Sequence, residues 1–166
     1  MPGDLWQFSL AFYSRPGVAP ACLCCQDETG TDVNMILFLL WQAGDGVSLR
    51  QDEVAAIDHD VRSWRELVVQ ALRGVRRHLK ALDTAATEAL RSAVKSAELE
   101  AEQLQQQQLS HYARGHEAAP ALDAAISNLD AYQAATGRVL PPGAVSALLD
   151  AFANRPTNPT EGAIHG

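Results

Sequence analysis

The chain has 166 residues, of which 47% are hydrophobic and 20% charged, and its formal net charge is −7. This length suits one domain with a single core. The acidic balance argues against a nucleic-acid partner, because a phosphate backbone repels an acidic surface. The longest apolar run, residues 35–41, is far shorter than the roughly 20 residues of a membrane-spanning helix. The first residues also lack the basic and apolar stretches of a signal peptide, so we expect a cytoplasmic protein with no membrane partner.

Good helix formers dominate the sequence, and no segment alternates with a period of two over the length of a strand. The sequence therefore predicts an all-α fold. A capping-box spacing places one helix start at Ser48, with a break near residues 58–60. Caps and stop residues delimit the other short helices, which we expect over residues 4–14, 18–28, 32–42, 121–135 and 142–153.

Two longer helices, a basic one and a second over residues 84–112, are predicted to form an antiparallel hairpin that turns near residues 81–84. Small or apolar residues recur at heptad spacing in the second helix, at Leu90, Val94, Ala97, Ala101 and Leu104, until Gln108 ends the seam. The basic helix carries a matching apolar stripe at Trp64, Val68, Val75, Leu79 and Leu82. We interpret the glutamine run 105–108 as the polar end of the second helix.

These elements predict a single-domain helical bundle with a long antiparallel helical hairpin. We expect the domain to cover residues 1–153, with its main part over 4–110 and a helical C-terminal part over 117–153. Residues 154–166 lack periodicity and are predicted to form a disordered tail.

Residues 62–80 contain six Lys or Arg residues and one acid, in a chain that is acidic overall. At about 100° per residue, the bases fall on one side of a helix and the apolar residues on the other. Arginine suits bidentate binding of carboxylate or phosphate. One interpretation is that this face binds an acidic partner. The other is that Glu98, Glu100 or Glu102 of the second hairpin helix neutralises it through ion pairs. Its candidate binding residues are Arg62, Trp64, Arg65, Arg73, Arg76, Arg77 and Lys80.

A short polar elbow joins the second and third predicted helices and contains Gln26, Asp27, Asp32 and Asn34. Side chains at helix ends commonly cap free backbone groups, and Asp32 fits an N-cap. The alternative is a small polar site, such as a cation bound by Asp27, Asp32 and Asn34. The elbow lacks the alternating oxygen ligands of a calcium loop, so the sequence favours a capping network.

The cysteines and the remaining candidates give no catalytic signature. Cys22 and Cys25 share a helix face, but a zinc site usually needs a second ligand pair, so we expect core packing rather than a metal or redox role. The carboxylate pairs Asp58/Asp60 and Glu98/Glu102 have neighbours typical of exposed positions. No nucleotide-binding, acyl-transfer or zinc-protease motif occurs. We therefore predict neither enzymatic activity nor a cofactor nor a metal site.

Four stretches of the chain resemble a known family: residues 4–18, 21–41, 64–80 and 93–105. Their motifs are Leu5-Trp6, a Gln-Asp pair followed by Gly and Asp-Val-Asn, Trp64-Arg65, and the Arg-Arg-His-Leu-Lys end of the basic helix. They are similar to an uncharacterised proteobacterial family of helical proteins of about this length, catalogued as a domain of unknown function (DUF2390). The resemblance covers roughly residues 4–110. It implies a shared fold and no assigned activity.

The basic face without a catalytic constellation predicts a non-enzymatic adaptor or regulatory protein that contacts an acidic protein partner. The alternative is a binder of a small phosphorylated or carboxylated ligand, with Trp64, Arg65 and Arg73 near its pocket. A homo-oligomer is a further expectation, because Leu99 lies opposite the predicted hairpin seam.

Overall fold

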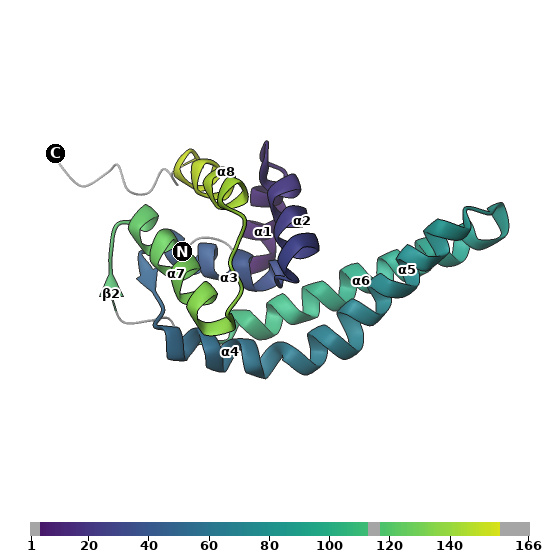
Figure 1. Cartoon of the computed structure of the whole chain (residues 1–166), viewed down its shortest axis with the longest axis horizontal. Coiled ribbons are helices and arrows are strands. Elements are labelled where there is room, and N and C mark those ends of the chain that lie inside the picture. The colour runs from purple at the N-terminus through teal and green to yellow at the C-terminus, as the bar shows by residue number, and fades with distance from the viewer. Residues whose placement is uncertain (1–3, 113–116, 157–166) are drawn as a thin grey trace.

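Helices form most of the described chain, which covers residues 4–112 and 117–156 of the computed structural model (Figure 1). Two-residue strands pair antiparallel, with Val47 opposite Ala118. The predicted all-α fold is confirmed, and the elements pack as one helical body. Most of the predicted tail, residues 157–166, lies outside the described residues. In chain order the elements are α1 Leu5–Tyr13, α2 Val18–Thr29, α3 Val33–Gly44, β1 Val47–Ser48, α4 Gln51–Trp64, the π-helix η1 Arg65–Val69, α5 Gln70–Leu82, α6 Ala85–Ser110, β2 Glu117–Ala118, α7 Ala121–Thr136 and α8 Pro142–Ala153.

Helix α3 is the centre of the core, and its side chains from Asn34 to Ala43 are buried. It contacts α1, α2, α6 and α7, so apolar residues on every side of it find a partner. Burial of this apolar helix is a main source of stability, at about 1.5–3 kcal/mol for each large side chain. No helix in the described part of the chain is long and apolar enough to cross a membrane.

The predicted hairpin is confirmed: α5 and α6 pack together, and the end of the hairpin around their connecting turn projects away from the other helices (Figure 1). The predicted heptad seam is confirmed only in its middle, where Ala101 is buried and Val94 and Ala97 are half-buried. Leu90 and Leu104 are exposed, whereas Glu98, Gln105 and Leu109 are buried. The C-terminal part of α6 buries this face because the helix contacts α1 and α3 as well as α5. Val75 and Leu82 of the predicted α5 stripe are also about half exposed.

The predicted helix start at Ser48 is wrong, because this residue belongs to β1. The side chain of Asn128 on α7 holds the segment extended: its Oδ1 accepts from the Leu49 N–H at 2.8 Å, and its Nδ2 donates to the Val47 carbonyl at 2.9 Å. Helix α4 begins at Gln51 instead, and the Arg50 N–H donates to Glu53 Oε2 at 2.8 Å. The expected break near residues 58–60 does not occur, since α4 continues to Trp64.

Candidate functional site

A chain of hydrogen-bonded, buried polar side chains crosses the centre of the molecule from α1 through α6 to α3. Ser9 Oγ donates to Gln106 Oε1 at 2.9 Å, and Gln106 Nε2 donates to Asn34 Oδ1 at 3.0 Å. Asn34 Nδ2 then donates to Gln105 Oε1 at 3.2 Å, and Gln105 Nε2 donates to Asp32 Oδ2 at 2.7 Å. Each amide both donates and accepts, so its orientation is fixed by its two neighbours.

The chain ends in a buried ion-pair cluster around Arg65. Arg65 Nη1 lies 3.0 Å from Asp32 Oδ2 and 2.8 Å from Asp58 Oδ1. Burial acts to lower the pKa of Arg65, but the charges and hydrogen bonds of Asp32 and Asp58 outweigh it and raise the pKa. The Asp32 N–H donates to the hydroxyl of Tyr132, whose pKa burial raises to about 12. Asp32 therefore both caps α3, as predicted, and anchors Arg65.

A second ion-pair cluster joins α5 to α6. Arg73 lies 3.2 Å from Glu98 Oε1 through Nε and 3.1 Å from Glu102 Oε1 through Nη2, and Arg76 also pairs with Glu98. Burial acts to raise the pKa of Glu98, but Arg76 and Arg73 lower it below its ordinary value. Burial raises the pKa of Glu102, the charges of Glu98 and Asp32 add to this, and Arg73 opposes it. The ionised form of Glu102 is therefore less stabilised than the ionised form of Glu98.

The π-helix η1 joins α4 to α5 beside both clusters. The Gln70 N–H bonds to the carbonyl of Arg65, five residues earlier, and Arg65 and Val69 are buried. Trp64 Nε1 donates to the Ala101 carbonyl of α6 at 2.9 Å, which ties this turn to the hairpin. Single π-turns inside α-helices occur frequently at functional sites. Neither proline nor glycine lies within this turn, so the sequence offered no marker for it.

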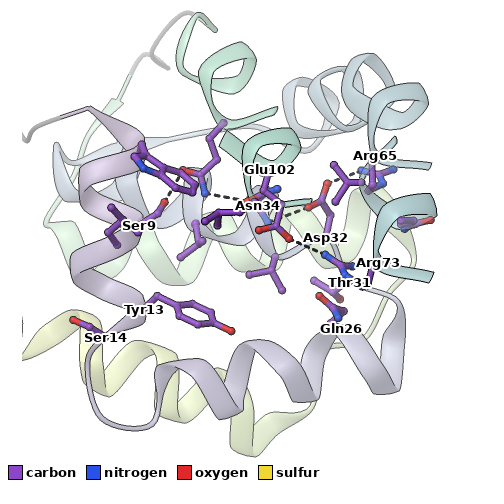
Figure 2. Close-up of a pocket in the computed structure, with 18 residues that line it drawn as sticks. Ser9, Tyr13, Ser14, Gln26, Thr31, Asp32, Asn34, Arg65, Arg73 and Glu102 are labelled. Carbon is purple, nitrogen blue, oxygen red and sulfur yellow. Dashed lines mark hydrogen bonds and ion pairs between the residues drawn. The ribbon is translucent and has the colours of Figure 1, made fainter. Parts of the chain in front are cut away.

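These elements enclose a pocket of about 330 Å³, here called the α1–α6 pocket (Figure 2). Its walls come from α1, the end of α2, the elbow before α3, α3 itself, η1, α5 and α6, and its volume is in the range of small-molecule sites. Leu10 and Leu99 line it and remain about half exposed. The apolar lining is Trp6, Leu10, Val33, Leu37, Val69 and Leu99, and the hydrogen-bonding lining is Ser9, Tyr13, Ser14, Gln26, Thr31, Asp32, Asn34, Arg65, Gln70, Arg73, Glu102 and Gln106.

Every arginine of the predicted basic face forms an ion pair with an acid of this chain. Besides the two clusters, Arg62 lies 3.8 Å from Asp58, and Arg77 lies 3.2 Å from Asp27. Lys80 is exposed and has no ion pair within the described residues. These contacts are the internal ion pairs that the sequence left open as one interpretation, although the side chains of Arg62 and Arg77 remain about half exposed. Among the predicted binding residues, Arg65 and Arg73 line the α1–α6 pocket, whereas Trp64 does not.

The four residues of the predicted polar elbow do not form one site. Gln26, Asp32 and Asn34 line the α1–α6 pocket, but Asp27 is exposed and pairs with Arg77. The alternative cation site is therefore not assembled, because Asp32 is committed to Arg65 instead. Within the described residues, no group of three or more His, Cys, Asp or Glu side chains could hold a metal ion.

Sequence reasoning missed Ser9, Asp58, Gln105 and Gln106. The glutamine run 105–108 does lie at the end of α6, and Gln107 and Gln108 are exposed, but Gln105 is 0% exposed and Gln106 2%, so half of the run is buried. Asp58 and Glu98, expected among exposed neighbours, are buried as well. One available signal was the spacing of Glu98, Ala101, Gln105 and Leu109, which follows a helical face of period 3.6 rather than a heptad.

The predicted core packing of the cysteines is confirmed for Cys22 and Cys25, which belong to the hydrophobic core. Burial raises the pKa of Cys22 to about 12 and that of Cys25 to about 11. The nucleophilic form of cysteine is the thiolate, so both thiols are poorly reactive near neutral pH.

Comparisons with known proteins agree with the family resemblance noted in the sequence. No curated protein and no solved structure matches this chain. A family model described as a protein of unknown function (DUF2390) matches residues 4–109, well over half of the chain. The matched region runs from α1 to the end of α6 and includes all the residues that line the α1–α6 pocket. This chain therefore belongs to the DUF2390 family, whose function is unknown.

Proposed function

We propose that this protein binds a small organic molecule in the α1–α6 pocket and acts as a binding or regulatory protein rather than an enzyme. The observation that carries the proposal is the buried polar chain from Ser9 to Asp32. It holds hydrogen-bonding groups in fixed positions along the pocket wall, where Ser9, Asn34 and Gln106 contribute both to the chain and to the lining.

Energetics support a role for this polar chain beyond folding. Burying amides and charges costs free energy that internal hydrogen bonds only offset, and apolar residues of similar volume would often be as stabilising. Most of the buried polar side chains here line the pocket or contact a residue that lines it, whereas Gln42 and Asn128 are buried elsewhere. Apolar walls with a few fixed polar groups are the usual composition of a small-molecule site.

A binding role fits the ionisable groups of the wall better than a catalytic one. Asp32 is paired with Arg65, and Glu102 is paired with Arg73. Groups held in this way can orient a ligand without exchanging a proton with it. The same pairing supports an acidic protein partner on the basic face less well, because its arginines are already neutralised.

Thermal unfolding in the presence of a panel of small organic acids, amines, zwitterions and neutral amphiphiles tests this function. A ligand at about 100 times its dissociation constant should stabilise the protein by about 2.7 kcal/mol. Leu99→Trp should fill the pocket mouth and abolish the shift. Leu90→Trp is the matched control, because Leu90 lies on the same helix with 55% exposure against 52% for Leu99 and does not line the pocket.

Two results would overturn the proposal. One is that no compound in the panel stabilises the protein. The other is that the stabilisation survives in Leu99→Trp, which would place the ligand elsewhere.

A further inference from the structure

Resting on the proposed function, we propose that the ligand is a zwitterion with an apolar body, of the α-amino acid class. Its ammonium group contacts Glu102, and its carboxylate contacts Arg73 and Arg65. Figure 2 shows Arg73 and Glu102 joined at the wall of the pocket, with Asp32 and Arg65 beside them.

The presence of both positive and negative side chains in the pocket wall favours a zwitterionic ligand. Its charged lining consists of two guanidinium groups and two carboxylates, with N···O distances of 3.1 Å for Arg73–Glu102 and 3.0 Å for Arg65–Asp32. Glu98 and Asp58, which do not line the pocket, share the same two guanidinium groups. A lone anion drawn to Arg73 is repelled by Glu102, and a lone cation at Glu102 is repelled by Arg73. A ligand with both charges on neighbouring groups aligns antiparallel to the Arg73–Glu102 pair and satisfies both.

Unused hydrogen-bonding capacity remains on the same side chains. Arg65 uses only Nη1 for its two carboxylates, Arg73 uses Nε and Nη2, and Glu102 uses only Oε1. Within the described residues, the buried side-chain atoms that lack a partner belong to Arg15 and Gln42. The unused nitrogen and oxygen atoms of Arg65, Arg73 and Glu102 therefore keep solvent-accessible surface, and all three side chains line the pocket.

The rest of the pocket suits an apolar side chain. Trp6, Leu10, Leu37, Val69 and Leu99 line it, and its volume of about 330 Å³ accommodates one amino acid with a large side chain. The raised pKa of Glu102, caused first by burial, is consistent with this assignment, because a bound ammonium would favour the ionised carboxylate.

Calorimetric titration with three matched compounds tests the inference: L-phenylalanine, 3-phenylpropionate, which lacks the ammonium group, and 2-phenylethylamine, which lacks the carboxylate. L-Leucine and L-tryptophan extend the series in side-chain size. We expect the amino acids to bind and the two single-charge analogues to bind about tenfold more weakly or worse, since each loses a hydrogen bond between charged groups.

Glu102→Gln keeps the shape of the side chain and removes its charge, and we expect it to weaken amino acid binding by about tenfold or more. Glu100→Gln is the matched control, because Glu100 is an exposed residue of the same helix outside the pocket lining. Circular dichroism of both variants checks that they fold. Unchanged binding in Glu102→Gln overturns the inference.

The series also separates the inference from the proposed function. If the single-charge analogues bind as tightly as the amino acids, and Leu99→Trp abolishes that binding, the zwitterion class is wrong and the pocket still binds ligands. If no amino acid binds while another compound of the panel does, the inference fails in the same way. If nothing binds, both fail.

Discussion

The basal and distal halves of the α5–α6 hairpin have similar helix-forming sequences but different environments. The basal half, residues 65–76 and 98–109, contacts α1, α3 and α4 and contains the buried ion pairs, glutamines and Leu109. The distal half, residues 77–97, projects from the body, and its Leu82 and Leu90 are about half exposed (Figure 1). Composition is therefore a poor guide to burial in this hairpin. The presence of neighbouring helices decides which face of each helix is buried.

Arg65 and Arg77 offer the sharpest test of this contrast. Arg65→Met should lower the free energy of unfolding by about 3–5 kcal/mol, because it leaves the buried Asp32 without a counter-charge and leaves Asp58 only the longer pair with Arg62 at 3.8 Å. Arg77→Met removes an exposed pair with Asp27 and should cost about 0–1 kcal/mol. Urea unfolding of both variants measures the difference, and equal losses would contradict the distinction between the two halves.

A pair of leucines on α6 tests the same contrast without charge. Leu109→Ala should lower the free energy of unfolding by about 2–5 kcal/mol, because it creates a cavity in the core. Leu90→Ala should change it by no more than about 0.5 kcal/mol, as expected for a surface position. Chemical denaturation under identical conditions compares them. A large loss in Leu90→Ala would show that the distal half is covered in solution, as a homo-oligomer would require.

The smallest expected effect is on the pH dependence of stability, to which two carboxylates of the basal half, Glu98 and Glu102, should contribute with opposite sign. The pKa of Glu98 is lowered on folding, because Arg76 and Arg73 outweigh the effect of its burial. The ionised Glu98 therefore contributes to stability above its pKa in the unfolded chain, and this contribution is lost as pH falls through its pKa in the folded protein. The pKa of Glu102 is raised, chiefly by burial, so its protonation favours the folded state and this contribution is lost as pH rises.

The free energy of unfolding of Glu98→Gln and Glu102→Gln should be measured from neutral to acidic pH. The loss of stability on acidification should differ from that of the unsubstituted protein in opposite directions for the two variants. Glu98→Gln should lose less stability on acidification, and Glu102→Gln should lose more. Parallel curves for the two variants would show that the carboxylates share one environment.

The sequence predicted those helix ends that are set by residues only a few positions away. Gly30 and Gly137 end α2 and α7 in the left-handed conformation, and Pro142 begins α8, as the sequence indicated. Asp32 was predicted as a cap from its place before an apolar run. Each of these features depends on residues a few positions apart.

The candidate site depends instead on contacts between distant segments. Ser9 and Gln106, whose side chains are hydrogen-bonded, lie 97 positions apart in the chain, and Arg65 lies 33 positions from Asp32. The helical pattern of Arg62–Lys80 indicated a basic face, but it did not identify the acids that neutralise it. For the same reason, the capping-box spacing at Ser48 could not show that Asn128 holds that segment extended.

The π-turn at Arg65–Val69 makes the length of this segment as important as its residue types. Helix α4 before the turn packs against α7, whereas α5 after it packs against α6. Removing one residue from the turn would restore an unbroken α-helix and rotate all of α5 by about 100° relative to α4. Arg73 and Arg76 would then point away from Glu98 and Glu102, although no side chain in either cluster had changed. The extra residue thus sets the rotational phase between the body of the protein and its projecting hairpin.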